Sequence, residues 1–489
     1  MVPAHRIQQI NSACFNSAGR FILYWMISSR RTQDNFALEY ALLLSEKHQK
    51  PLLVLEALRS DYLHSSDRFH RFIIEGMSDN QEAFEQSGVY YYPYVEEKTG
   101  KGKGLLQALS TQACTVITDY YPCFFLPSMV QKAAKQCPVS MFWVDANGIL
   151  PLFETQRTFT TAASFRRHVQ KTILSYLSEF PTAKPLQEYQ TIPLQTLPKE
   201  IEAQWEKADL KNLLKPDGLI DLPIDHSVLP ISIRGGENQA FKMLDSFLQQ
   251  NFHRYHTARN QTDENACSGL SPYLHFGHIS THRIVQNIFE REKYTPPAVA
   301  PKATGSREGW WGLSEFAEAF LDQIITWREL GFVFNHQNLD RYDQYSSLPD
   351  WAQKTLDEHR TDPREYIYSL DDLEQSKTHD PIWNAAQNQL REEGIIHNYL
   401  RMLWGKKLLE WTETPEQALE YLLILNNKYS IDGRDPNSYS GIFWILGRFD
   451  RAWGPERSIF GKIRYMSSDS TARKIKLKNY LSYYNPAAH

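Results

Sequence analysis

Two tryptophans stand seven residues apart in the segment RMLWGKKLLEW, residues 401–411, with two lysines between them. Seven residues make two turns of an α-helix and about 10 Å of rise, so Trp404 and Trp411 are predicted to share one helix face. Aromatic side chains either fill a core or bind planar ligands. Spacing alone favours core packing, so a chemical role for this pair depends on the motifs around it.

Polar residues in the same half of the chain could bind a phosphate and a planar ligand. In SGLSPYLHFGHIS, residues 268–280, small residues with hydroxyls and backbone N–H groups precede a helix-like stretch, which suits a phosphate. An ordinary helix cap explains the same residues. Arg401 and Asp432 are candidates for a buried ion pair beside a ligand, since a lone buried charge is costly, or for two separate surface residues.

A basic segment near the C-terminus could contact nucleic acid. Residues 448–478 hold nine Lys or Arg against three acids, with Trp453 and Tyr465 interleaved, whereas the whole chain of 489 residues has a net charge of −4. Nucleic-acid binding would therefore need a local patch such as this one. A solvated basic face is the alternative interpretation.

Cysteine use and hydropathy exclude several classes of protein. The five cysteines show no C-x-x-C spacing, so the sequence predicts neither a disulfide framework nor a zinc or iron–sulfur site. The first 30 residues lack the apolar region of a signal peptide, and no run approaches the length of about 18 apolar residues that spans a membrane. We expect a cytoplasmic protein with no metal and no membrane segment.

The elements that would position these residues fall into two domains. Apolar runs alternate with helical segments such as 34–47 and 127–136 in the first third of the chain; the runs lie at 21–27, 51–58, 89–95, 115–121 and 139–145. This alternation predicts an α/β domain with a doubly wound parallel sheet over residues 20–165. No G-x-G-x-x-G follows the first strand, so the usual dinucleotide fingerprint is absent.

A proline-rich connection and a helical domain follow the predicted sheet. Seven prolines scatter between residues 181 and 235, and residues 166–235 are predicted to link the two domains. Residues 236–489 show mainly helical patterns, notably at 314–334, 382–393 and 395–411, with a Pro- and Gly-rich loop at 294–309. The second domain is therefore predicted to be mainly α-helical.

The order of several motifs in the helical half resembles one known family. LSPYLHFG, WREL, THDPIWNAAQ, HNYLRMLWGKKLLEW, IDGRDPN and FGKIRYM occur in the order and at the spacing of the photolyase/cryptochrome flavoproteins. They resemble especially the class II cyclobutane pyrimidine dimer photolyases, as does LYWMISSRRTQDNFALEYA near the N-terminus. The similarity extends over almost the whole chain, and motifs of this length and order are far more specific than any single cluster above.

The resemblance implies a U-shaped FAD in the helical domain. Motif matches place Arg401 and Asp432 beside the isoalloxazine, and either Asn426 or Asn437 near flavin N5. The residues matched to the diphosphate region are Tyr255, Ser268, Gly269, Leu270 and Ser271, with Cys267 standing where a small residue such as Thr is usual. A second, antenna chromophore of unknown identity would belong to the first domain.

The same resemblance gives the tryptophans a chemical role. Trp404, Trp383 and Trp411 match a chain that conducts an electron from the surface to photoexcited flavin. Indole is readily oxidised, and short hops between rings outrun one long transfer. Leucine could do neither, which would explain why tryptophan rather than leucine occupies this helix face.

Further matches imply a DNA substrate. Trp327 and Trp444 match the aromatic pair that clamps a flipped-out pyrimidine dimer. Met402 and Asn398 match residues of the same pocket, with Asn398 also assigned to the cofactor. The residues matched to phosphate contacts are Arg451, Arg457, Lys462 and Arg464.

Two departures from class II place the chain on a divergent branch. Gln323 stands four residues before Trp327, where class II enzymes carry a glutamate that hydrogen-bonds the dimer, and Leu403 stands where tyrosine is common. Glutamine can still donate a hydrogen bond, but it cannot supply a proton. Slower repair or a different preferred lesion would follow.

The resemblance predicts a monomeric enzyme that repairs cyclobutane pyrimidine dimers in UV-damaged DNA by electron transfer from photoexcited reduced FAD. One alternative is a cryptochrome-like blue-light photoreceptor. Another is a photolyase for (6-4) photoproducts, although spacing assigns neither His379 nor His397 as its catalytic base. A light-independent binder of damaged or single-stranded DNA is the third, and it leaves the tryptophan chain unexplained.

Overall fold

The computed structural model describes residues 2–295 and 299–485 of the chain. The chain forms two compact units, each assembled from segments that are separate in the sequence. The first unit comprises residues 1–156, 173–245 and 270–293, and the second comprises 157–172, 246–269 and 294–489, as far as these residues are described.

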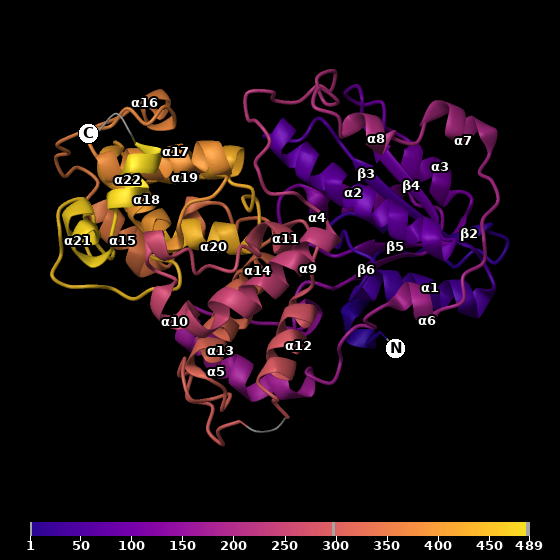
Figure 1. Cartoon of the computed structure of the whole chain (residues 1–489), viewed down its shortest axis with the longest axis horizontal. Helices are drawn as coiled ribbons and strands as arrows, with labels where there is room; N and C mark the ends of the chain where they lie inside the picture. The colour runs from indigo at the N-terminus through magenta and orange to yellow at the C-terminus, as the bar shows by residue number, and fades with distance from the viewer. Residues whose placement is uncertain (1, 296–298, 486–489) are drawn as a thin grey trace. The chain divides into compact units, whose positions relative to one another are not determined.

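Six strands of the first unit form one sheet in the order β1-β6-β5-β2-β3-β4 (Figure 1). They are β1 (Ile7–Gln9), β2 (Phe21–Met26), β3 (Leu52–Leu58), β4 (Tyr90–Val95), β5 (Ala113–Asp119) and β6 (Met141–Val144). Strands β2 to β6 pair in parallel, whereas β1 pairs antiparallel with β6. All five predicted strands are confirmed; β1 is not predicted, because its residues IQQ form no apolar run.

The continuous apolar runs of the strands follow from their burial. Every side chain of β2 is buried, and Leu23 pairs with Leu53 of β3 on one side and Val116 of β5 on the other. A parallel strand that is covered on both faces has no reason to alternate polar and apolar residues. Helix α1 (Phe36–His48) packs against β2 and β5, and the side chain of Asn35 caps it by accepting hydrogen bonds from two backbone N–H groups.

The remaining helices of the first unit surround the sheet or belong to the connection that follows it. The longer ones are α2 (Asp67–Ser87), α4 (Leu126–Gln136), α9 (Glu237–Ser246) and α12 (Thr281–Arg291), and the shorter ones are α3 (Leu105–Ser110) and α11 (Ser271–His275). The proline-rich connection holds only short helices in place of a long one. These are α6 (Pro185–Glu188), α7 (Lys199–Gln204) and α8 (Leu210–Leu213), which pack on α1, α3 and α2 respectively.

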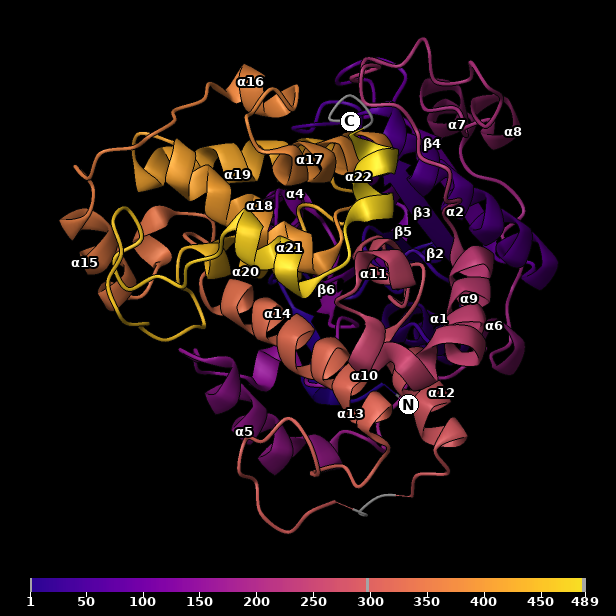
Figure 2. The same cartoon turned by 60° about the vertical axis from the view of Figure 1, so that its left-hand side comes forward.

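The described part of the second unit is helical, as predicted (Figure 2). Its helices are α5 (Ala162–Thr172), α10 (Tyr255–Ala258), α13 (Glu315–Leu321), α14 (Arg328–Gln337), α15 (Asp350–Glu358), α16 (Leu370–Glu374), α17 (Pro381–Glu393), α18 (Asn398–Trp411), α19 (Pro415–Tyr429), α20 (Pro436–Ile445), α21 (Ser468–Lys474) and α22 (Lys478–Tyr484). A π-helical segment, η7 (Asp322–Trp327), joins α13 to α14. The predicted loop at 294–309 has no helix or strand in its described part, and its residues 296–298 lie outside the described residues.

Two motifs of the sequence are helix starts. In THDPIW, the Asp380 side chain accepts hydrogen bonds from the backbone N–H groups of Ile382 and Trp383, and Pro381 occupies the first helical position of α17. Asp435 and Pro436 begin α20 in the same way. Capping therefore fixes where each helix begins and so where its functional side chains lie.

Two glycines allow helices of the second unit to approach closely. A Cβ atom on Gly331 of α14 would lie 2.7 Å from Ser440 Oγ and 2.8 Å from the Pro436 carbonyl oxygen of α20. A Cβ atom on Gly405 of α18 would lie 1.9 Å from Cδ1 of Ile445 at the end of α20. Both α14 and α18 thus contact α20 directly, which brings the helices that carry the candidate site together.

Across the described residues, no helix is both long and apolar enough to cross a membrane.

Candidate functional site

Three buried tryptophans form a continuous row between α17 and α18. The rings of Trp383 and Trp404 are nearly parallel, with centroids 6.4 Å apart and an interplanar angle of 7°. The rings of Trp383 and Trp411 meet edge to face at 5.7 Å. The sequence predicts Trp404 and Trp411 on one face of α18, and the structure places Trp383 of α17 between them.

Hydrogen bonds fix the orientation of these rings. Trp383 Nε1 donates to the carbonyl oxygen of Trp404 at 3.0 Å, and Trp404 Nε1 donates to Oε1 of Gln387 at 2.9 Å. Each of the three indoles is at most 2% exposed. Indoles held in fixed orientations with centroids at most 6.4 Å apart can exchange an electron over short distances.

The row continues beyond Trp411 toward solvent through residues that the sequence did not point to. The rings of Tyr368 and His379 lie 5.4 Å and 5.2 Å from that of Trp411, and Tyr368 shares a 2.6 Å hydrogen bond with His379 Nδ1. Tyr366, which is 39% exposed, stacks on His379 at 3.8 Å. Only the THDPIW motif, which contains His379, could have indicated this end of the row.

The predicted pair of Arg401 and Asp432 forms. Both Nη atoms of Arg401 lie 3.3–3.4 Å from Oδ1 of Asp432, which also accepts a 2.6 Å hydrogen bond from Ser430. The two side chains are 24% and 15% exposed, so the pair is half-buried rather than enclosed. Arg401 lies one helical turn before Trp404, and the pair is therefore next to the first tryptophan of the row.

The two asparagines that the sequence could not separate have different surroundings. Asn426 of α19 is buried, and its amide nitrogen donates to Ser438 Oγ at 2.9 Å. Asn437 of α20 is exposed, and within the described residues its side chain has no hydrogen-bond partner. The assignment of either residue to a flavin N5 stays a prediction.

Two helices present unburied stripes that contain predicted site residues. On α18 the stripe consists of Asn398, Arg401 and Met402, whereas most of the following residues of the helix are buried. On α20 it consists of Asn437, Gly441 and Trp444, and a Cβ atom on Gly441 would meet nothing within 4 Å. Residues three and four apart share a helix face, so each stripe is a single surface open to a ligand.

Gln323 and Trp327 form a third half-buried surface, on η7. They are four residues apart, and within the described residues neither side chain has a hydrogen-bond or ring partner. A large aromatic ring and an amide without partners in a helix that is otherwise buried are what a ligand pocket requires. Segments of π-helix are rare and occur frequently at functional sites.

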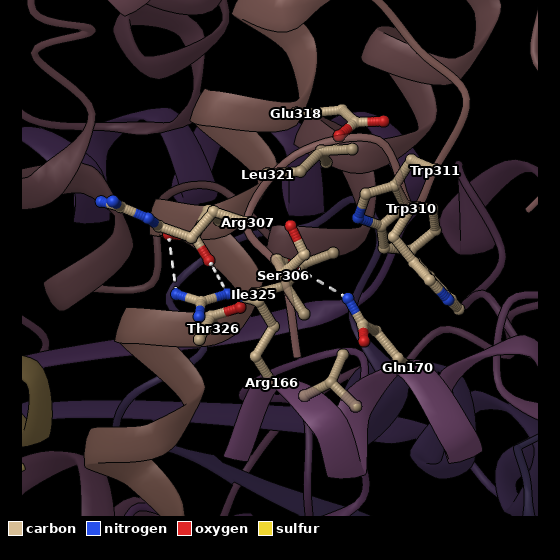
Figure 3. A pocket seen from close by; sticks show the side chains of 12 residues that line it. Arg166, Gln170, Ser306, Arg307, Trp310, Trp311, Glu318, Leu321, Ile325 and Thr326 are labelled. Atoms are coloured by element: carbon tan, nitrogen blue, oxygen red, sulfur yellow. Dashed lines mark hydrogen bonds and ion pairs between the residues drawn. The ribbon is translucent and has the colours of Figure 1, made fainter. Parts of the chain in front are cut away.

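A buried ion pair joins η7 to α5. Arg166 of α5 donates from Nε to Oδ1 of Asp322 at 2.7 Å and from Nη2 to Oδ2 at 3.1 Å, and both side chains are less than 10% exposed. Figure 3 shows Arg166 and Gln170 of α5 at the small pocket beside this pair, together with Trp310 and Trp311. Because the Arg166 and Asp322 side chains already pair with each other, we assign this pair to the support of Gln323 and Trp327.

The residues predicted to hold a diphosphate come from segments of both units: Tyr255, Ser268 and Gly269 from the second, and Leu270 and Ser271 from the first. Tyr255 is buried in contact with Phe247 and Phe320, and burial raises the pKa of its hydroxyl to about 12. The loop 268–271 leads into α11, with Gly269 and Ser271 exposed and the side chain of Leu270 buried. Leu270 could therefore contact a ligand only through its backbone.

The basic C-terminal residues lie between α20 and α21. Arg451, Arg457 and Lys462 are exposed, and Lys462 pairs with Glu456 at 3.1 Å. Arg464 is less accessible, because it pairs with Asp450 at 3.1 Å and stacks over Trp453 at 4.0 Å.

Comparison with known proteins identifies the family. The chain is 34% identical over 482 residues to the deoxyribodipyrimidine photo-lyase of Methanothermobacter thermautotrophicus, with 98% of each chain covered. It is 32% identical over 492 residues to that of Potorous tridactylus, with 99% of this chain and 85% of the other covered. The chain belongs to the photolyase/cryptochrome family.

A solved photolyase shares the fold. A class III photolyase from Agrobacterium tumefaciens matches with a TM-score of 0.65 at 15% identity, covering 96% of this chain and 87% of the other. No family model matches the chain. The photolyase assignment therefore rests on the full-length relatives, and the solved structure supports the fold.

The chemistry of the site fits the flavin that the photolyase family implies. Within the described residues the amide groups of Asn398 and Asn437 have no hydrogen-bond partner, and Arg401 and Asp432 supply a half-buried guanidinium and carboxylate. Groups of these kinds can satisfy the polar edge of a heterocycle. Over residues 2–295 and 299–485, no three His, Cys, Asp or Glu side chains form a group that could hold a metal ion.

Proposed function

We propose that this photolyase-family protein repairs cyclobutane pyrimidine dimers in DNA under light. The observation that carries the proposal is the combination of a buried tryptophan row with aromatic and amide side chains on α18, α20 and η7 that are not fully buried. Full-length relatives named deoxyribodipyrimidine photo-lyase support the same reaction. A binder without photochemistry would not need three indoles in contact.

FAD would be held mainly by residues on helices of the second unit. Arg401, Asp432 and one of Asn426 and Asn437 would contact the isoalloxazine, and the loop 268–271 with Tyr255 would hold the diphosphate. Bound FAD would supply the light-absorbing redox centre, receiving electrons through the tryptophans and lending one electron to the dimer. The amide of Asn426 or Asn437 can either donate or accept a hydrogen bond, so it tolerates different charge states of the isoalloxazine.

The row of indoles would conduct an electron inward. Trp411 lies at the outer end, next to Tyr368, and Trp404 lies one turn from Arg401. Each hop joins rings whose centroids are at most 6.4 Å apart. The buried rings exclude water, which keeps the charged intermediate state of each indole away from competing reactions in solvent.

Trp327 and Trp444 would receive the extruded dimer. Both rings are half-buried, which leaves aromatic surface for stacking against the two pyrimidines. Gln323 would donate an amide hydrogen bond to a dimer carbonyl, and Met402 would fill the apolar side of the pocket. Extrusion is cheapest for a lesion that already stacks poorly, which gives selectivity over intact bases.

Exposed cations near the C-terminus would bind the DNA backbone. Arg451, Arg457 and Lys462 carry the accessible charges, and Trp453 adds an aromatic surface. Phosphate contacts give affinity that depends on salt and hardly on sequence. The net charge of −4 makes this local patch the main attraction for DNA.

An antenna chromophore and a monomeric state stay predictions from the resemblance. The strand order of the first unit reverses between β5 and β2, where α/β sheets commonly bind ligands. Directly at the ends of these strands, Asp119 Oδ2 accepts the backbone N–H groups of Ile27, Ser28 and Ser29 at 2.8–3.0 Å. Any antenna would therefore have to bind beyond this hydrogen-bonded turn.

Repair of defined lesions tests the proposal. The purified holoprotein, chemically reduced, is illuminated with an oligonucleotide that carries one cyclobutane thymine dimer or one (6-4) product, and the products are separated by chromatography. Intact thymines from the cyclobutane dimer in light, and none in the dark, are the expected result. Light-driven cofactor reduction without repair of either lesion would instead favour a photoreceptor, and repair of the (6-4) product alone would change the substrate.

A further inference from the structure

Lys406 is a buried cation that neither the electron path nor the DNA contacts use. It follows Gly405 on α18, and its side chain is wholly buried. Its Nζ donates a short hydrogen bond to the carbonyl oxygen of Ile445, the last residue of α20. Within the described residues it forms no ion pair, although an ammonium group has three N–H donors.

The second contact of the same amine is the indole of Trp444. Nζ lies 5.1 Å from the ring centroid, within the range of a cation–π interaction. Trp444 belongs to the last turn of α20, so one amine contacts both the carbonyl end of this helix and the ring next to it. A cation at a helix C-terminus is also favoured by the helix dipole.

We propose that Lys406 is a positioning residue for the aromatic clamp: its charge holds the Trp444 ring in place at the end of α20. The proposal rests on the clamp role of Trp444 given above. A methionine or leucine would fill the same space without the cost of a buried charge, so packing alone does not explain a lysine here.

The charge on Lys406 changes near neutral pH. Burial lowers the pKa of Lys406 to about 7, with Arg464 lowering it further and Asp450 raising it. The Lys406 amine beside Trp444 is therefore mostly protonated at pH 6 and mostly neutral at pH 9, while the Arg464 guanidinium also lies 5.4 Å from the Trp444 ring centroid.

The test observes Trp444 directly. Holoprotein is labelled with 5-fluorotryptophan, the Trp444 resonance is assigned by its loss in W444F, and its fluorine chemical shift is followed from pH 6 to 9. We expect a titration with a midpoint near the pKa of Lys406, which K406Q and K406M abolish. K407M is the matched control, because Lys407 pairs with Glu410 and lies over Trp411 instead.

Binding measurements test whether the charge of Lys406 affects recognition of damaged DNA. K406Q keeps a hydrogen-bond donor for the Ile445 carbonyl but not the charge, so it separates the cation from a simple helix cap. We expect the affinity of K406Q for dimer-containing DNA at pH 6 to fall about 3- to 10-fold, while its affinity for undamaged DNA is unchanged. Wild-type protein should lose the same preference between pH 6 and 9.

The outcomes separate this proposal from the function it rests on. If W444A leaves the preference for damaged DNA intact, Trp444 is not part of the clamp and the proposed site is wrong. If W444A removes the preference but K406Q retains it, or if the Trp444 resonance titrates unchanged in K406Q, Lys406 is only a helix cap and the positioning role is overturned.

Discussion

At the scale of single residues, Gln323 determines which interactions the site can make with a dimer carbonyl. Within the described residues its amide has no hydrogen-bond partner, and it lies four residues before Trp327 on the same helical segment. An amide can donate a hydrogen bond to a dimer carbonyl but cannot transfer a proton. Repair with glutamine at this position should therefore proceed, but with less stabilisation of the charge that develops on the dimer.

The substitution Gln323→Glu should raise the yield of dimer splitting about threefold, because a protonated carboxyl donates a stronger hydrogen bond than an amide. The measurement is the number of dimers split per absorbed photon by the reduced holoprotein. Gln337→Glu, at the far end of α14, serves as a control for the added acidic group. An unchanged yield would mean that another group already stabilises the dimer.

Trp404 is the inner member of the tryptophan row. Trp404→Phe should slow light-driven reduction of the bound cofactor about tenfold or more, equivalent to about 1.4 kcal/mol of barrier, because phenylalanine is much harder to oxidise than tryptophan. Repair by chemically pre-reduced protein should stay close to wild type, which serves as the internal control. Photoreduction at the wild-type rate would remove Trp404 from the path.

At the scale of elements, the ion pair between α5 and η7 supports the substrate surface. Asp322→Asn leaves the Arg166 guanidinium without its charged partner in a buried position, which should lower the free energy of unfolding by about 3 kcal/mol. It should also weaken the preference for damaged DNA, because Gln323 and Trp327 follow Asp322 on the same π-helical segment and depend on it for their position. Thermal unfolding and DNA binding are measured on the same preparation.

A double substitution provides the control for this prediction. Arg166→Met combined with Asp322→Leu removes both charges and should recover much of the lost stability, since a buried pair can be replaced by apolar residues at little cost. A single Asp322→Asn variant as stable as wild type would show that the pair does not support η7.

The individual elements could be predicted from the sequence, but their contacts could not. Apolar runs and helical periodicity gave the strands and most helices of the site, because these patterns are local. The position of Trp383 between Trp404 and Trp411 depends on how α17 packs on α18, and no periodicity encodes that contact. Likewise, Lys406 and Lys407 are adjacent and of the same type, so the sequence does not show that Lys406 is buried against Trp444 while Lys407 pairs with Glu410.

At the scale of the whole molecule, the chain passes between its two units several times. Residues 270–293 return to the first unit after residues 246–269 have joined the second. Local composition cannot reveal such a return, because α12 looks like any amphipathic helix. The assignment of residues 268–271 to a diphosphate comes from a motif match and stays a prediction, since a motif match depends on sequence order and not on packing.

DNA binding should depend on few phosphate contacts, because the chain as a whole is acidic. Neutralising Arg451 and Arg457 with glutamine should lower affinity equally for damaged and undamaged DNA. It should also reduce the slope of log Kd against log salt concentration by about 2, close to one per lost phosphate contact. Lys478→Gln, in α22, is the control, because it also removes one positive charge but lies outside the proposed contacts. An unchanged slope in the double variant would place the DNA contacts elsewhere.

The central claim is that the pocket of Trp327 and Trp444 holds the lesion while light drives its repair. The most direct measurement compares the reduced wild-type holoprotein with Trp327→Ala, in light and in the dark, for binding and repair of an oligonucleotide with a single thymine dimer. We predict light-dependent repair by the wild type, and for Trp327→Ala a loss of about 1 to 3 kcal/mol in affinity for damaged but not undamaged DNA, with repair reduced accordingly. Repair in the dark, or equal loss of affinity for both DNAs, would contradict the account.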